Sequence, residues 1–179
     1  SRSGGIACLI SLFVFFFIYN LLFHEVLYQY LFIVSSLFLI GCFEDFKWKI
    51  SPNFRLIMMI ILLVIFINIL QIKILNIDLV FLNFLLNNQL FSTIFILLCF
   101  LFVVNGANLI DGFNGLLTIN VIIINSVLLY MNLSNDQLSF SFFLSAQLVI
   151  LITFLLFNFP KAKMFLGDSG AYMMGSIIA

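Results

Sequence analysis

Four acidic residues of this 179-residue chain lie in three short polar segments whose residue types suit phosphate chemistry. The segments are EDFKWKISPNFR (44–55), NGANLIDGFNG (105–115) and NFPKAKMFLGDSG (158–170), and their acidic residues are Glu44, Asp45, Asp111 and Asp168. Mg²⁺ prefers oxygen ligands and commonly takes one or two carboxylates together with the phosphates of a substrate. Lysine side chains and the backbone N–H groups of glycine-rich turns suit the phosphates themselves. If the three segments converge, they predict a site for Mg²⁺ and a phosphate-bearing substrate.

The same residues also have purely structural interpretations. Asp111-Gly112 is an ordinary turn dipeptide, and Asp168 is placed where it could cap a following helix. Asn105 and Asn108 are harder to explain in this way, because polar groups at the end of a buried apolar helix need hydrogen-bond partners. The residues alone therefore leave both interpretations open for the two aspartates.

The elements that must position these residues are apolar to a degree that soluble domains do not reach. The chain is 65% hydrophobic and 8% charged, with 25 Phe and 2 Pro, and its mean hydropathy is +1.31. Soluble domains are about 45–50% apolar and about 25% charged. Disorder requires low hydrophobicity and high net charge. The net charge here is zero, which offers no basic surface for nucleic acid. The composition predicts an integral membrane protein in the lipid bilayer.

Cysteine and histidine contribute no recognisable site. Cys8, Cys42 and Cys99 lie inside apolar runs without a CxxC pair, and His24 is the single histidine. Buried, unreactive thiols are therefore expected rather than a metal centre or a disulfide framework.

The fold expected is all-α, a polytopic membrane helical bundle. A membrane-spanning helix needs about 20 mainly apolar residues. Six such runs and the start of a seventh occur, at 5–23, 26–43, 56–72, 89–104, 116–131, 139–157 and 170–179. The tract 73–88 is shorter and carries Lys73 and Asp78, and we interpret it as an interfacial or re-entrant segment. We expect residues 1–179 to form a single membrane-embedded catalytic domain, a partial one that belongs to a longer chain.

Lysine and arginine are distributed unevenly between the two sets of connecting segments. Six of the seven cations lie in the segments at one end of the expected spans, namely Arg2, Lys47, Lys49, Arg55, Lys161 and Lys163. Only Lys73 lies at the other end. The positive-inside rule places the first set in the cytoplasm. All four acidic residues above belong to that set, so the candidate site faces the cytoplasm.

The motifs resemble those of the polyprenyl-phosphate N-acetylhexosamine-1-phosphate transferase family, glycosyltransferase family 4. The resemblance rests on GCFEDFKWKISPNFRL, NGANLIDGFNGL and NFPKAKMFLGDSGAYMMGS, in this order, and on Gly4-Gly5 in SRSGGIA. This family includes phospho-N-acetylmuramoyl-pentapeptide transferase and undecaprenyl-phosphate GlcNAc-1-phosphate transferase. Members transfer a sugar-1-phosphate from a UDP-sugar to a membrane polyprenyl phosphate and release UMP, with Mg²⁺ (Mn²⁺ as a substitute) as cofactor. The resemblance implies a multi-pass enzyme of the bacterial inner membrane.

The resemblance also implies roles for individual residues. It makes Glu44, Asp45, Asp111 and Asp168 catalytic, with Asp168 and Asp111 as metal ligands, and Asn105, Asn108, Gly112, Asn158 and Lys163 as substrate-binding residues. Asp45 would engage the lipid phosphate, either positioning it or removing a proton. Direct attack by the lipid phosphate is favoured over a covalent aspartyl intermediate. The wording of the motifs is closer to members that use UDP-GlcNAc, as in O-antigen synthesis, than to the peptidoglycan enzyme. The family's loop rich in His and Arg lies beyond the end of this chain.

Other functions fit the sequence less well. A transporter with an acidic ion site at the cytoplasmic face is the main alternative, because intramembrane carboxylates often mark ion pathways. The acids here gather at one face, whereas alternating access uses a site at the midplane. The signature of CDP-alcohol phosphotransferases is absent, since Phe-Asn-Gly-Leu follows Asp111-Gly112. The sequence is compatible with a homodimer but does not determine the oligomeric state.

Overall fold

The chain is described by a computed structural model that covers residues 2–24, 27–46, 48, 50–74, 77, 79–135 and 138–179. Lys47, Lys49 and Asp78, which entered the charge pattern above, lie outside the described residues. Within the described residues the chain forms eight helices and no strand. They are α1 (Gly4–Phe23), α2 (Tyr28–Asp45), α3 (Pro52–Leu70), α4 (Val80–Leu86), α5 (Gln89–Ile110), α6 (Leu116–Leu133), α7 (Leu138–Asn158) and α8 (Gly167–Ile178).

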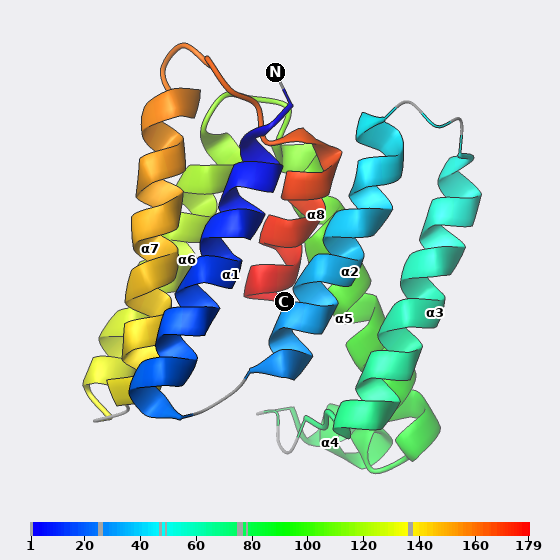
Figure 1. Ribbon diagram of the computed structural model, residues 1–179. Helices are drawn as coiled ribbons and strands as arrows, with labels where there is room; N and C mark the ends of the chain where they lie inside the picture. The colour runs from blue at the N-terminus through cyan, green and yellow to red at the C-terminus, as the bar shows by residue number, and fades with distance from the viewer. Residues whose placement is uncertain are drawn as a thin grey trace.

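The long helices run up and down in alternation (Figure 1). The start of α1, the end of α2, the turn between α5 and α6 and the start of α8 all lie at the same end of the bundle, which we call the site end. The short helix α4 lies at the opposite end. The three polar segments therefore meet at one end, as the alternation of the sequence predicts.

The prediction of a polytopic helical membrane protein is confirmed, but the count of six spans and the start of a seventh is not. Among the described helices, five are long and apolar enough to cross a membrane, α1, α3, α5, α6 and α7. Helix α2 is not one of them, because Gln29, Glu44 and Asp45 lower the hydropathy of its ends. Helix α8 has only 12 residues. Helix α4, with 7 residues, is too short to span, in agreement with the interpretation of 73–88.

Two helices begin at residues whose side chains cap them. The Ser51 hydroxyl accepts a hydrogen bond from the Phe54 N–H at 3.3 Å, and Pro52 is the first residue of α3, where its missing N–H has no consequence. The Asn88 side chain accepts from the N–H groups of Leu90 and Phe91 at the start of α5. Such caps satisfy N–H groups that have no partner inside the helix.

Helix α8 lies in the centre of the bundle, against α1, α2 and α5 (Figure 1). Glycines allow this approach. A Cβ atom added to Gly5 would lie 2.7 Å from the Gly170 Cα, and one added to Gly41 would lie 2.4 Å from the Ser169 Cα. On the third side, a Cβ added to Gly175 would lie 2.8 Å from the Val104 Cα. Small residues at helix crossings are typical of membrane bundles, where close van der Waals packing drives association.

The start of α1 is tied to the segment that leads into α8. The Gly4 N–H donates to the Phe165 carbonyl and the Gly5 N–H to the Leu166 carbonyl, both at 3.0 Å. Free N–H groups of one helix thus fix the approach to another, and this places the first residues of α8 beside α1 and α2.

Candidate functional site

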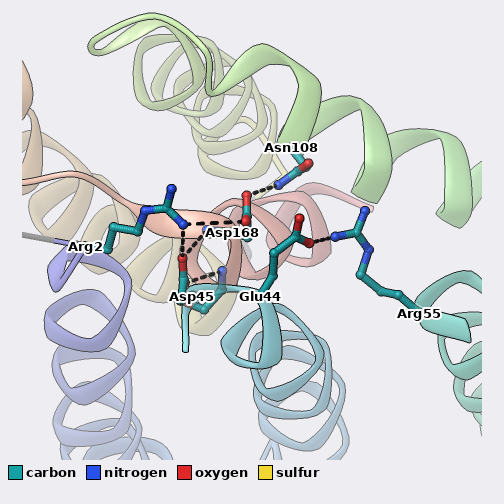
Figure 2. A network of polar contacts seen from close by, with 7 residues as sticks. Arg2, Glu44, Asp45, Arg55, Asn108 and Asp168 are labelled. Carbon is teal, nitrogen blue, oxygen red and sulfur yellow. Dashed lines mark hydrogen bonds and ion pairs between the residues drawn. The ribbon is translucent and has the colours of Figure 1, made fainter. Parts of the chain in front are cut away.

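Side chains from α2, α5 and α8 meet at the site end, together with Arg2 from the start of the chain (Figure 2). Asp45 is the last residue of α2, Asn108 lies in the last turn of α5, and Asp168 lies in the first turn of α8. Each of the three comes from a different sequence motif. The expected convergence of the motifs is therefore present in the fold.

The carboxylate of Asp45 accepts hydrogen bonds from the start of α8. Its Oδ1 accepts from the Asp168 N–H at 3.1 Å. Its Oδ2 accepts from the Ser169 N–H at 3.0 Å and from the Ser169 hydroxyl at 2.6 Å. Arg2 Nη1 lies 3.3 Å from Asp45 Oδ1. The side chain of Asp45 is only 11% exposed, so this carboxylate is largely enclosed by the donors that bind it.

Asp168 is more open. Its Oδ1 accepts a hydrogen bond from Asn108 Nδ2 at 2.9 Å, and its Oδ2 lies 4.0 Å from Arg2 Nη1. The side chain is 29% exposed. Asp168 was also considered as a cap of the last helix. Instead its side chain bonds to α5, and Asp45 supplies the acceptor for the first N–H groups of α8.

Glu44 points toward α3 rather than toward Asp168. It forms an ion pair with Arg55, and the Arg55 guanidinium lies over the ring of Tyr172 with its Cζ 5.4 Å from the ring centroid. Figure 2 shows this pair beside the Asp45 and Asp168 cluster. Glu44 and Asp45 are thus adjacent in sequence but bind different partners.

Asp111 follows α5 and has an unusual ionisation. Its backbone N–H donates to the Ala107 carbonyl at 3.1 Å, as expected for the residue that ends a helix. Burial raises the pKa of its carboxyl group to about 7, and the negative charges of Asp168 and Asp45 raise it in the same direction. Three carboxylates therefore lie close enough at the site end to disfavour one another's charge.

The remaining predicted residues lie in several different environments. Helix α5 continues to Ile110, so Asn105 and Asn108 are helical and do not lie in a loop as expected. Asn105 donates to the Leu101 carbonyl at 2.9 Å. Gly112 is an exposed residue of the following turn, and Lys163 is also exposed. These two residues and Asn105 are not hydrogen-bonded to the Asp45 and Asp168 cluster.

Asn158 is buried and bonds to two parts of the backbone. Its Oδ1 accepts from the Gly115 N–H at 2.5 Å, and its Nδ2 donates to the Met164 carbonyl at 2.8 Å. Gly115 has a φ of 75°, a conformation that favours glycine. Asn158 therefore holds the α5–α6 turn and the segment before α8 together, and its substrate-binding role remains a prediction.

The carboxylates do not form a complete metal site by themselves. No group of three or more His, Cys, Asp or Glu side chains is placed to hold a metal ion in the part of the chain that the structure describes. Mg²⁺ does not require such a group, since one or two carboxylates and substrate phosphates suffice. The donors available at the site end, Asp168 and Asp111, match that smaller requirement.

Two residues of the cluster were not identified from the sequence. Arg2 was counted only as a cytoplasmic cation, and Ser169 only as the neighbour of Asp168. The signal for Ser169 was its place in the motif GDSG, directly after Asp168. Nothing local indicated that its hydroxyl would bond to a residue 124 positions away.

Comparison with known proteins agrees with this geometry. The model of the family described as "Glycosyl transferase family 4" matches residues 27–179. A phospho-N-acetylmuramoyl-pentapeptide-transferase of Clostridium perfringens (strain 13 / Type A) is 33% identical over 104 residues, 58% of this chain and 33% of the relative. One of Pelagibacter ubique (strain HTCC1062) is 27% identical over 200 residues, 96% of this chain and 55% of the relative. The chain thus spans between a third and about half of these relatives. Since the family model matches most of the chain, including all three acidic motifs, this protein belongs to glycosyl transferase family 4.

Proposed function

We propose that the full-length protein transfers an N-acetylhexosamine-1-phosphate from a UDP-sugar to a polyprenyl phosphate and releases UMP, in the synthesis of a cell-wall or surface polysaccharide. The observation that carries the proposal is the meeting of Asp45, Asn108 and Asp168 from three distant motifs. Membership of the family and the names of the relatives support it. The transporter alternative receives no such support.

The place of the cluster suits substrates of different solubility. A polyprenyl chain stays in the bilayer and brings its phosphate to the interface, whereas a UDP-sugar arrives from water. A site at the end of an apolar bundle is accessible to both. The excess of Lys and Arg among the segments at the site end supports a cytoplasmic orientation, as expected in a bacterial inner membrane.

The reaction we propose is a direct phosphoryl transfer. An oxygen of the lipid phosphate forms a bond to the phosphorus that carries the sugar, and the bond from that phosphorus to UMP breaks, with the electron pair leaving on UMP. Such transfers depend on positioning and on neutralisation of charge. Asn108 orients Asp168 through its hydrogen bond, and Lys163 would supply a positive charge to the phosphate oxygens.

The chemistry of the site fits a magnesium ion. The raised pKa of Asp111, caused by burial and by two neighbouring carboxylates, reflects a local excess of negative charge that a divalent cation relieves. Asp168 and Asp111 would hold the ion, and Mn²⁺ could take its place. When bound, the ion neutralises charge on the diphosphate of the donor.

The donor sugar has two candidates. The Glu44-Asp45 pair and the segment KMFLGDSGAYMMG resemble members that use UDP-GlcNAc. The relatives above are named for transfer of phospho-N-acetylmuramoyl-pentapeptide. We propose UDP-GlcNAc as the donor and treat the pentapeptide donor as the alternative to be tested.

The test uses the full-length protein in membranes with polyprenyl phosphate, Mg²⁺ and either UDP-GlcNAc or UDP-MurNAc-pentapeptide. We expect UMP release that requires both the lipid phosphate and the metal, and that is lost in Asp168→Asn but kept in a control, Asn120→Ala, whose exposed side chain bonds only within α6. Release with the pentapeptide donor alone would keep the reaction and change the pathway. No release with any UDP-sugar from well-inserted protein would refute the proposed function.

A further inference from the structure

The hydrogen bonds of Asp45 leave its carboxylate without a free acceptor position. An ionised carboxylate has about four lone-pair sites. Four donors occupy them, the N–H groups of Asp168 and Ser169, the Ser169 hydroxyl and the Arg2 guanidinium. Since the side chain is also 11% exposed, a proton or a phosphate could reach it only by displacing one of these donors.

Three of the four donors belong to the first turn of α8, which lacks a cap of its own. The N-cap residue is Leu166, and its side chain makes no capping hydrogen bond. The first N–H groups of any helix have no partner inside the helix, and a negative charge beside them is favourable. Asp45, which belongs to α2, supplies both the acceptors and the charge.

Gly167 allows this contact. Its φ is 77°, and a Cβ atom added there would lie 2.7 Å from Asp45 Oδ2. A side chain would therefore meet the carboxylate directly and would also be strained at that φ. The glycine of the GDSG motif is thus required for α2 and α8 to meet through Asp45.

The consequence concerns Asp168, the more open of the two carboxylates. Its own backbone N–H is held by Asp45 at 3.1 Å, while its side chain is oriented from the other side by Asn108 at 2.9 Å. The position of the Asp168 carboxylate is therefore set by α2 and α5 together. A displacement of about 1 Å at such a residue can lower the rate about 100-fold.

We propose that Asp45 is a positioning residue rather than the group that binds or deprotonates the lipid phosphate. It acts by anchoring the first turn of α8, with the Ser169 hydroxyl as its closest partner, and it thereby fixes Asp168. This inference rests on the proposed function for its catalytic readout, but the anchor itself is a structural claim that can be measured separately.

The kinetic test uses the full-length protein with variants Asp45→Asn, Ser169→Ala and their combination. We expect kcat to fall about 10-fold in Ser169→Ala, as for the loss of one hydrogen bond to a charged group, and about 100-fold in Asp45→Asn. KM for polyprenyl phosphate is expected to stay within about 2-fold, because uniform binding is unchanged. Ser176→Ala is the matched control, since this buried hydroxyl of α8 donates only to the Met173 carbonyl, and it should leave kcat unchanged.

The double variant separates the two roles of Asp45. If Ser169 acts only through Asp45, the combined loss equals that of Asp45→Asn alone, because the two side chains form one interaction. A combined loss equal to the product of the single losses would overturn the proposal. So would a KM for polyprenyl phosphate that rises strongly in Asp45→Asn but not in Ser169→Ala, or an unchanged kcat in Ser169→Ala. If Asp45→Asn does not fold, the comparison of Ser169→Ala with Ser176→Ala still decides.

Amide hydrogen exchange tests the anchor without any turnover. The Asp168 and Ser169 N–H groups should exchange faster in Asp45→Asn than in the unaltered protein, whereas amides in the middle of α7 should not change. Faster exchange in a protein that releases no UMP would refute the proposed function and leave the anchor intact. Unchanged exchange in an active protein would refute the anchor alone.

Discussion

The contact between α2 and α8 gives a direct prediction through Gly41. A Cβ atom added there would lie 2.4 Å from the Ser169 Cα, 2.5 Å from the Ser169 nitrogen and 2.6 Å from the Asp168 carbonyl oxygen. All three are backbone atoms, so no side-chain rotation can relieve the overlap. Gly41→Ala must therefore push the first turn of α8 away from α2, where Asp45 holds it.

The size of the effect follows from two opposing contributions. Overpacking of a tight contact costs about 3 kcal/mol at the upper end of the usual range. Replacement of glycine by alanine inside a helix returns about 1 kcal/mol. The net destabilisation of Gly41→Ala is thus about 2 kcal/mol, which corresponds to a fall in Tm of about 4–8 °C.

Gly106 provides the matched control. It also lies inside a helix near the site end, but a Cβ atom added to it would meet nothing within 4 Å in the described part of the chain. Gly106→Ala should therefore gain about 1 kcal/mol from helix propensity alone, and Tm should rise by about 2–4 °C.

The assay is thermal unfolding of the full-length protein in detergent, followed by measurement of UMP release. We expect Gly41→Ala to be less stable than the unaltered protein and to lose activity, and Gly106→Ala to be at least as stable. Equal Tm values for the two alanine variants would show that α2 and α8 do not approach as closely as the structure indicates.

Three further predictions concern single residues of the site. Asp168→Asn should abolish turnover while membrane insertion stays intact, as measured by UMP release and by the amount of protein in the membrane fraction; persisting Mg²⁺-dependent release would remove Asp168 from the metal site. The folded-state pKa of Asp111 lies at about 7, above its ordinary value of 3.8, so this group stabilises the metal-free protein fully below about pH 4 and ceases to do so as the pH rises through 7. Tm should accordingly fall between pH 5 and pH 8 (chosen to bracket that pKa), apparent Mg²⁺ affinity should rise over the same range because the ion competes with the proton, and Asp111→Asn should weaken both trends. Asn158→Ala should lower the free energy of unfolding by about 2–4 kcal/mol, because two buried backbone groups lose their partner, whereas Asn120→Ala should change it little; similar losses in both would contradict the proposed tie.

The sequence by itself determined the class of protein and the end of the bundle at which chemistry occurs. Apolar runs of about 20 residues and their alternating polar connections are local properties of the chain, and the cost of placing charge in hydrocarbon forces such runs to span. The motif residues could be named for the same reason, since Asp111 and Asp168 stand out within a few positions of sequence. The number of spans was less secure, because α2 carries the polar residues of the site at its own end.

Only the tertiary structure decided what each of these residues touches. Asp45 and Glu44 are neighbours in sequence, yet one bonds to α8 and the other to Arg55. Asn158 was expected to bind substrate, but its side chain joins two backbone segments. These contacts join residues up to 124 positions apart. Such contacts depend on how closely helices approach, which glycines at positions 41 and 167 allow but which no local pattern specifies.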